Sequence, residues 1–169
     1  MRIIAGEWRG RHIKAPKGDA VRPTLDRVRE AWMSIVHMTL PDARVADLFA
    51  GSGALGLEAL SRGAAHVDFV ENDPRTLRVL EENVKALGAG DRATLHRGDA
   101  LAFISAAAPY DIVFADPPYR KGIATELAER WLKSPFSTIF GVEHEAFETM
   151  PAGGDTRKYG DSSITIFRQ

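Results

Sequence analysis

The chain has 169 residues, of which 44% are hydrophobic and 27% are charged. This length is close to that of one domain, and the composition is typical of a globular protein with a single core. No uninterrupted apolar run approaches the roughly 20 residues that a membrane-spanning helix requires. The first residues hold only a short apolar run before a charged stretch, too short for the centre of a secretory signal, so we expect a cytoplasmic protein.

Cysteine is absent from the sequence. This excludes disulfides, thiolate metal sites and every mechanism that uses a cysteine nucleophile. The five histidines lie far apart, and no pair has the spacing of a helical metal site. We therefore expect no metal centre.

Charge is distributed unevenly along the chain. The formal net charge is −1, but residues 1–33 contain eight basic and four acidic residues, a balance of +4, which leaves −5 for the remainder. Such asymmetry indicates that the N-terminal region meets a polyanion. The alternative is an ordinary solvated loop.

The N-terminal region predicts little regular structure before its first helix. Residues 2–5 are a short strand candidate, and Gly6 to Arg22 lack any helical or strand period, which predicts an extended arm. Pro23 and Thr24 then open an amphipathic helix, with Thr24 as its cap and Pro41 beyond its end.

From residue 43 onward, short β-rich runs alternate with helical runs. The predicted strands are Arg44–Phe49, His66–Glu71, Ala93–His96, Asp111–Ala115 and Ser137–Glu143, and the predicted helices are Ala54–Ser61, Pro74–Leu87, Ala100–Ala106 and Ile123–Leu132. Residues 156–159 and 163–167 predict a closing β-hairpin across Gly160 and Asp161. This alternation predicts an α/β fold, a doubly wound and mostly parallel sheet with helices on both faces.

The first of these strands leads into a glycine-rich turn, Asp47-Leu48-Phe49-Ala50-Gly51-Ser52-Gly53-Ala54-Leu55-Gly56. In a doubly wound sheet the ligand crevice lies at the carboxyl ends of the strands, where this turn sits. Glycines allow the backbone to approach a ligand closely, and the following helix start presents free N–H groups. The three glycines alone fit a dinucleotide site equally well.

Acidic residues near this turn favour an adenosine-containing cofactor. Glu71 ends the second strand 20 residues after Gly51, the spacing expected of a group that accepts hydrogen bonds from ribose hydroxyls. Asp47 can brace the turn and face a cationic ligand, and Asp99 can accept from an adenine amine or simply cap a helix. The cofactor-binding candidates are Asp47, Phe49, Gly51, Gly53, Glu71, Asn72, Asp99 and Ala100.

The most specific motif is Asp116-Pro117-Pro118-Tyr119, at the end of the fourth strand. The Asp116 carboxylate and the Pro117 carbonyl can both accept hydrogen bonds from one external amine. Tyr119 offers a ring face for a planar base. The alternative, that two prolines merely end a strand, does not explain the aromatic residue in the fourth position.

With this motif, the sequence resembles class I S-adenosylmethionine-dependent methyltransferases that act on an exocyclic amine of a nucleobase. Further segments resemble the bacterial 16S ribosomal RNA guanine-N2 methyltransferase family: Arg2-Ile3-Ile4-Ala5-Gly6, Arg9-Gly10-Arg11, Arg22-Pro23-Thr24, Asp26-Arg27-Val28-Arg29-Glu30, Val142-Glu143-His144 and Lys158-Tyr159-Gly160-Asp161. The chain departs from the family pattern at Trp32, Met33 and Ser34, and residues 145–155 align with nothing in it.

The resemblance implies a seven-stranded Rossmann-like sheet with a C-terminal antiparallel hairpin, and S-adenosylmethionine as cofactor. It implies Asp116, Pro117 and Tyr119 as catalytic residues, with residues 1–40 as a basic extension of a methyltransferase domain formed by residues 41–169. The implied RNA-binding residues are Arg2, Arg9, Arg11, Arg22, Thr24, Arg27 and Arg29. Since no separate target-recognition domain fits into this length, we expect the partner to be structured 16S ribosomal RNA within an assembling 30S particle.

Four other functions remain open from the sequence. The same four-residue motif serves adenine-N6 methyltransferases on DNA or RNA. Protein glutamine methyltransferases are less favoured, because they prefer Asn where this chain has Asp116. A nicotinamide-dependent oxidoreductase would need a further catalytic domain, and a non-catalytic RNA-binding protein would not need the intact motif.

Overall fold

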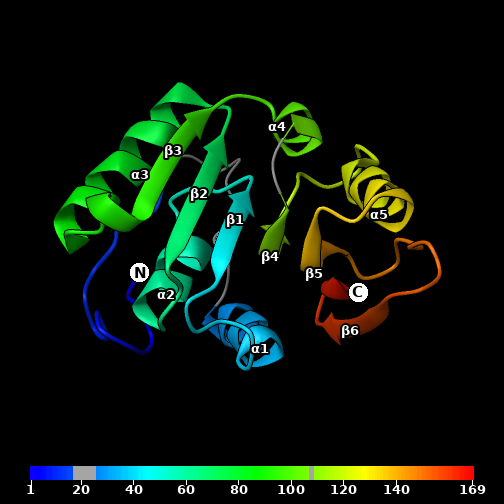
Figure 1. Cartoon of the computed structure of the whole chain (residues 1–169), viewed down its shortest axis with the longest axis horizontal. Coiled ribbons are helices and arrows are strands. Elements are labelled where there is room, and N and C mark those ends of the chain that lie inside the picture. The colour runs from blue at the N-terminus through cyan, green and yellow to red at the C-terminus, as the bar shows by residue number, and fades with distance from the viewer. Residues whose placement is uncertain (17–25, 107–108) are drawn as a thin grey trace.

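A seven-stranded sheet runs through the centre of the computed structural model, which describes residues 1–16, 26–106 and 109–169 (Figure 1). The strand order is β3-β2-β1-β4-β5-β7-β6. The strands are β1 (Arg44–Leu48), β2 (His66–Glu71), β3 (Ala93–Arg97), β4 (Tyr110–Ala115), β5 (Ser137–Glu145), β6 (Asp155–Tyr159) and β7 (Ser162–Arg168). β1 to β5 pair in parallel, whereas β5–β7 and β6–β7 pair antiparallel. The predicted sheet and its closing hairpin are confirmed.

Helices cover both faces of the sheet, also as predicted. They are α1 (Asp26–Val36), α2 (Ala54–Ser61), α3 (Pro74–Leu87), α4 (Ala100–Ala106) and α5 (Ile123–Lys133), with a short 3-10 turn at Gly90–Arg92. Alternate strand residues enter different cores: Val45 and Phe114 pack with the first three helices, whereas Ala46 and Val113 pack with α4 and α5. In the described part of the chain, no helix has the length and apolar content to cross a bilayer.

The boundaries of most elements follow from local chemistry that the sequence displays. α3 begins at Pro74 after Asp73, whose side chain accepts from the Thr76 amide at 3.0 Å, and it ends at Gly88 in the left-handed conformation. β5 continues to Glu145, two residues beyond its predicted end. The predicted start of the first helix at Pro23 and Thr24 lies outside the described residues.

The N-terminal segment differs from the prediction. Residues 2–5 form no strand; Arg2 makes a single antiparallel bridge to His12. Residues 6–16 are not an extended arm, because Ile3, Trp8 and Ile13 are buried in the same core as α2 and α3. The Glu7 amide donates to the Ser61 carbonyl at 2.8 Å. The apolar residues of this segment are too few to show a helical or strand period, but their burial holds the segment against the domain. In Figure 1 the segment passes beside α2 and α3.

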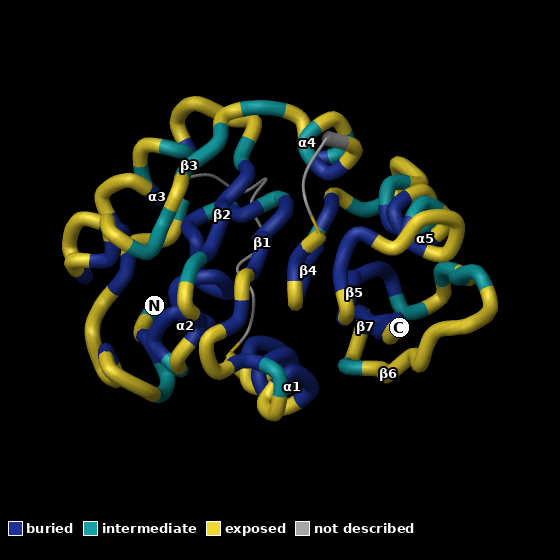
Figure 2. The backbone as a smooth tube through the Cα atoms, viewed as in Figure 1, coloured by how far each residue is buried: buried dark blue, intermediate teal, exposed yellow. Residues whose placement is uncertain are grey.

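The core lies along the middle of the sheet, as the burial colouring of Figure 2 shows. Strands β1 and β4 occupy the centre, and almost all their residues are buried. Parallel strands covered on both faces are expected to be apolar throughout. A polar residue buried in these strands therefore indicates a functional role. The main example is Asp47, which lies near the end of β1 and is 2% exposed.

Candidate active site

A cleft of about 1000 Å³ opens at the carboxyl ends of the central strands. Parallel strands β1, β2 and β4 all deliver their last residues to this edge of the sheet. The cleft brings together ten of the residues predicted from the sequence: Asp47, Phe49, Gly51, Glu71, Asn72, Asp99, Ala100, Asp116, Pro117 and Tyr119. The cofactor and catalytic motifs therefore share one site.

The glycine turn between β1 and α2 uses the left-handed backbone region repeatedly. Phe49, Gly51 and Gly53 have φ angles of 59°, 59° and 87°. A Cβ atom at Gly51 would have no neighbour within 4 Å, so the cleft stays open above this residue. The turn therefore exposes its backbone to a ligand.

Gly53 makes a close packing contact that was not predicted from the sequence. It does not line the cleft. A Cβ atom there would stand 2.4 Å from Leu80 Cδ1, so this glycine allows the start of α2 to pack closely against α3. The predicted contact of Gly53 with the cofactor stays a prediction.

Asp47 braces the turn from below, as expected. Its Oδ2 accepts a hydrogen bond from the Gly56 amide at 3.0 Å. Burial raises the pKa of Asp47 to about 8, although the Gly56 hydrogen bond acts in the opposite direction; the negative charge of Glu71 adds to the increase. A cationic ligand would stabilise the charged form of such a buried carboxyl group and lower its pKa.

Glu71 connects the glycine turn to the start of α3. Its two carboxylate oxygens accept from the amides of Gly51 and Asp73, both at 2.9 Å. Each oxygen retains a further acceptor site, which a ribose hydroxyl can use. Asp99 follows β3, and its carboxylate accepts from the Ala102 amide at 2.9 Å, so its capping role is present.

The Asp116-Pro117-Pro118-Tyr119 segment leaves β4 next to the glycine turn. Ala115, the last residue of β4, is the register partner of Leu48 at the end of β1. Pro117 is buried, while Asp116 and Tyr119 are half-buried at the cleft wall. A planar amine placed against this segment would therefore face the glycine turn.

Three residues that were not among the predicted site residues also line the cleft. Met1 and Pro16 reach the cleft because the N-terminal segment docks on the domain. Lys121 lies two residues beyond the proline motif and adds a positive charge to the wall. Only the position of Lys121 could have been anticipated, from its proximity to the motif. In the described ranges, no group of three or more histidine or acidic side chains is arranged to hold a metal ion.

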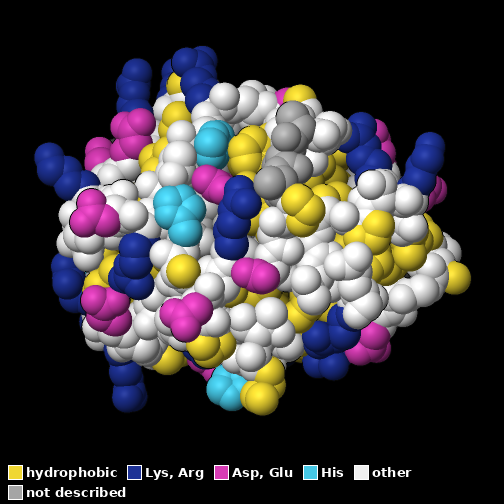
Figure 3. All heavy atoms as spheres, in the orientation of Figure 1, with side chains coloured by type: hydrophobic (Ala, Val, Ile, Leu, Met, Phe, Trp, Pro, Cys, Tyr) yellow, Lys and Arg dark blue, Asp and Glu magenta, His cyan; other side chains and the backbone are white. Residues whose placement is uncertain are grey.

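Four of the predicted RNA-binding residues, Arg2, Arg9, Arg11 and Arg27, are exposed. Arg11 also donates to the Ala86 carbonyl at 2.7 Å, which ties the N-terminal segment to the end of α3. Basic side chains project along the rim of the face shown in Figure 3, interspersed with acidic ones. Arg22 and Thr24 lie outside the described residues.

Arg29 is a correction to the predicted RNA-binding set. Its side chain is fully buried, and Nη2 donates to the Arg2 carbonyl at 2.6 Å and to Asp26 at 3.0 Å. The guanidinium also lies 3.7 Å from the buried carboxylate of Glu58, which accepts from the Ile4 and Ala5 amides. Arg29 therefore fixes the N-terminal segment to α2 and cannot reach an external phosphate.

Comparison with known proteins places this architecture in a family. The family model described as Conserved hypothetical protein 95 matches residues 1–168. The chain belongs to this family. Relatives of the chain are named as ribosomal RNA methyltransferases, so the resemblance found in the sequence is confirmed.

Two relatives show the extent of the similarity. "Ribosomal RNA small subunit methyltransferase D" of Escherichia coli strain K12 is 44% identical over 127 residues, which are 75% of this chain and 64% of that protein. The matched part thus spans slightly less than two thirds of this relative. "Putative rRNA methyltransferase YlbH" of Bacillus subtilis is 35% identical over an alignment covering 100% of this chain and 99% of that protein.

Solved structures agree with this family assignment. The structure of "Putative methyltransferase yhhF" from Escherichia coli superposes with a TM-score of 0.86 at 36% identity, covering 100% of this chain and 97% of that one. The predicted class I methyltransferase fold is confirmed.

Proposed function

We propose that this protein transfers the methyl group of S-adenosylmethionine to the exocyclic N2 amine of a guanine in small-subunit ribosomal RNA. The single observation that carries the proposal is that Asp116-Pro117-Pro118-Tyr119 lines the same cleft as the glycine turn. The names of the relatives support ribosomal RNA of the small subunit as the substrate class. Such a substrate would place the reaction in the cytoplasm.

The residues of the cleft fit S-adenosylmethionine. The volume of about 1000 Å³ leaves room for a cofactor and a base together. Asp47, whose pKa burial raises to about 8, offers a carboxylate that a cationic ligand would stabilise in its charged form. The open backbone at Gly51 and the free acceptor sites of Glu71 and Asp99 suit an amino acid group and an adenosine. When bound, this cofactor supplies a methyl group already activated by the positive charge on sulfur.

The protein's main task is then to orient the accepting amine. The lone pair of a guanine N2 amine is delocalised into the ring, which makes the amine a weak nucleophile. The Asp116 carboxylate and the Pro117 carbonyl would accept from its two N–H bonds, aim the lone pair at the methyl group and stabilise the developing positive charge. Alignment of this kind contributes roughly 7 to 11 kcal/mol in favourable cases.

Tyr119 would hold the base in this position. A base within a folded RNA must leave its stack to enter the cleft. Stacking on an aromatic side chain contributes roughly 1 to 3 kcal/mol of binding free energy per base, which offsets the lost stacking within the RNA. The half-buried position of Tyr119 at the cleft wall supports this proposed role.

The proposal is tested by offering the purified protein small ribosomal subunits from cells that lack it, together with methyl-labelled S-adenosylmethionine. We expect labelled RNA in which nucleoside analysis finds N2-methylguanosine. N6-methyladenosine instead would establish the adenine alternative, and the absence of label from RNA would overturn the proposal. Asp116→Ala serves as the inactive control.

A further inference from the structure

A second cavity, of about 530 Å³, adjoins the candidate active site. Its lining includes Tyr119, which also lines the first cleft, so the two cavities share a wall. The other lining residues come from the end of β5, the loop that follows it, and the β6–β7 hairpin: Glu145, Ala146, Phe147, Lys158, Gly160 and Asp161, with Arg120 beside the motif. None of these residues except Tyr119 is used in the proposed chemistry.

The topology puts this second cavity on the same edge of the sheet as the first. Glu145 at the carboxyl end of β5 is the register partner of Ser162, the first residue of β7. Ser162 also pairs with Tyr159, so the turn at Gly160 and Asp161 sits on the carboxyl edge. An RNA strand that extends from the first cleft past Tyr119 would therefore enter the second cavity.

Hydrogen bonds hold the rim of the cavity in place. The Ala146 amide donates to the Asp161 carbonyl at 3.0 Å, which joins the loop after β5 to the hairpin turn. The Glu148 amide donates to the Glu145 carbonyl at 3.0 Å and closes the loop into a tight turn. The cavity is thus a built feature, and its shape precedes any ligand.

Basic side chains surround the cavity. Arg120 is exposed, and its Nε contacts the largely buried Glu145 carboxylate at 3.2 Å, which holds the guanidinium at the rim. Lys158 lies on the edge strand β6. Arg27 at the start of α1 reaches the hairpin turn, with Nη2 3.5 Å from where a Cβ atom on Gly160 would stand. Arg120 and Glu145 offset each other's charge, and Lys158 with the nearby Arg27 outweighs Asp161, which leaves a small positive excess.

An aromatic ring is presented beside these charges. Phe147 follows β5, and 76% of its surface is exposed. It is one of three large hydrophobic residues exposed in the described part of the chain, and it alone of the three lines a described cavity. A ring next to cationic side chains is the arrangement with which proteins bind single-stranded nucleic acid.

We propose that this second cavity binds the nucleotide adjacent to the methylated base, with its base stacked on Phe147 and its phosphate contacted by Arg120 and Lys158. This inference rests on the proposed function, since it assumes an RNA strand in the first cleft. The cavity then contributes to recognition of the substrate RNA. Tyr119 separates the two bases.

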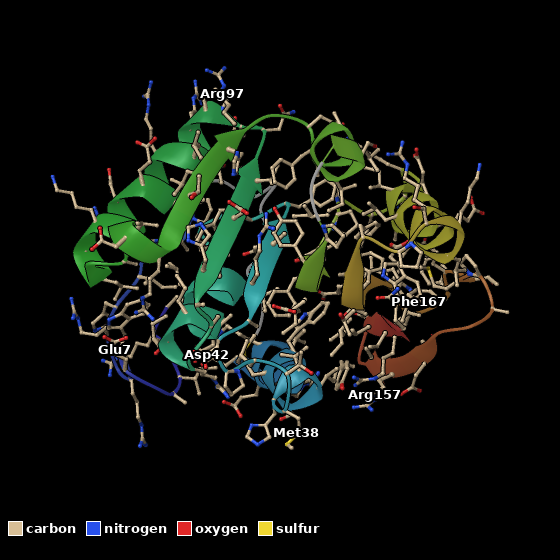
Figure 4. The ribbon with its side chains drawn as sticks, viewed as in Figure 1. Glu7, Met38, Asp42, Arg97, Arg157 and Phe167 are labelled. Atoms are coloured by element: carbon tan, nitrogen blue, oxygen red, sulfur yellow. The ribbon has the colours of Figure 1, made fainter. Side chains whose placement is uncertain are left out.

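The first experiment measures methylation of small ribosomal subunits by variants at the cavity. Phe147→Ala and Arg120→Ala should each raise KM for the subunits by about tenfold or more, while the Kd for S-adenosylmethionine stays within about twofold of wild type. Phe147→Trp should retain the wild-type KM and Phe147→Leu should not, because only an aromatic ring stacks on a base. Met38→Ala is the control for loss of an exposed hydrophobic side chain, and Lys133→Ala is the control for loss of the positive charge in Arg120→Ala; both residues are exposed, and Met38 projects from the opposite end of the sheet (Figure 4).

The second experiment locates the contact. With p-benzoylphenylalanine in place of Phe147, irradiation of the complex with small subunits should crosslink the protein to a nucleotide within about two positions of the methylated one, read by primer extension. The same group in place of Met38 should give no such crosslink.

The outcomes separate this inference from the proposed function. If wild-type protein methylates the subunits but the cavity variants keep the wild-type KM, or the crosslink falls elsewhere in the RNA or on a protein, the second cavity is not a nucleotide site and the proposed function stands. If wild-type protein transfers no methyl group to RNA, both proposals fall.

Discussion

The side-chain amide of Asn83 in α3 donates a hydrogen bond to the carbonyl oxygen of Ser52, inside the glycine turn, at 2.9 Å. The same side chain accepts from the Lys14 amide at 2.8 Å and donates to the Lys14 carbonyl at 2.9 Å. Asn83 is 2% exposed. One buried amide therefore fixes both the glycine turn and the N-terminal segment, in which the exposed Arg2, Arg9 and Arg11 lie.

Replacing this residue should affect both parts at once. Asn83→Ala removes three hydrogen bonds and leaves buried backbone groups unsatisfied, so we expect the free energy of unfolding to fall by roughly 2 to 4 kcal/mol and the affinity for S-adenosylmethionine to weaken. Urea unfolding and calorimetry measure the two effects. Glu82→Gln is the control, since it alters an exposed side chain of α3 that contacts Lys14 and leaves the Asn83 hydrogen bonds in place. Equal effects of the two variants would show that Asn83 has no special role.

Asp116→Ala should separate chemistry from cofactor binding. Loss of an acceptor aimed at developing charge commonly costs roughly 10² to 10³ in turnover. We expect such a loss in kcat for small subunits, with a calorimetric Kd for S-adenosylmethionine near that of wild type. Asp116→Asn keeps one acceptor oxygen, so its kcat should lie between that of the wild type and that of Asp116→Ala. Parallel loss of cofactor binding and turnover would mean that Asp116 holds the cofactor and not the base.

Asp47 should make cofactor binding depend on pH. Its pKa is raised from 3.8 to about 8 in the free folded protein, so the carboxyl is protonated at neutral pH and must release its proton when a cationic ligand binds. Calorimetry at pH 7 in buffers of different ionisation enthalpy should detect the release of about one proton, and affinity should rise with pH up to about 8. Asp47→Asn should bind more weakly and show no proton release; unchanged release would assign the proton to another group.

The raised pKa of Asp47 should also make the folded protein less stable as the pH increases. Because the folded pKa lies above the unfolded value, the contribution of Asp47 to stability is present below about pH 4 and is lost as the pH rises towards 8. The free energy of unfolding of the ligand-free protein should therefore decline over this range relative to that of Asp47→Asn. Urea unfolding at several pH values measures the difference, and parallel curves would contradict the assignment.

Arg29 and the exposed arginines should act on different properties. Arg29→Ala removes a fully buried guanidinium that contacts Glu58 and donates to the Arg2 carbonyl, while Glu58 keeps its ion pair with Arg62, so we expect a loss of roughly 1 to 3 kcal/mol in the free energy of unfolding. Arg9→Ala combined with Arg27→Ala should leave stability within about 0.5 kcal/mol and lower the salt dependence of RNA binding by roughly one to two phosphate contacts. Urea unfolding measures the stability of each variant, and filter binding over a series of salt concentrations measures the salt dependence of its RNA binding. A changed salt slope in a folded Arg29→Met variant would contradict the structural role.

Much of the fold could be predicted because its signals are local. The bounds of α2, α3 and α4 match their predictions residue for residue. Gly53 precedes α2, Asp73 and Gly88 flank α3, and Asp99 caps the start of α4. The two ligand motifs could be identified because parallel strands bring their carboxyl ends to one edge, which follows from strand order alone.

The sequence by itself thus determined the sheet, its helices and the meeting of the glycine turn with Asp116-Pro117-Pro118-Tyr119. Tertiary structure alone decided which arginine is buried, because Arg29 owes its position to Glu58, a partner 29 residues away that no local period reveals. It also decided that residues 1–16 dock on the domain and that the loop after β5 meets the hairpin turn beside Tyr119. Periodicity and capping act between neighbours in the chain, whereas burial of a charge and the shape of a cavity depend on side chains that only folding brings together.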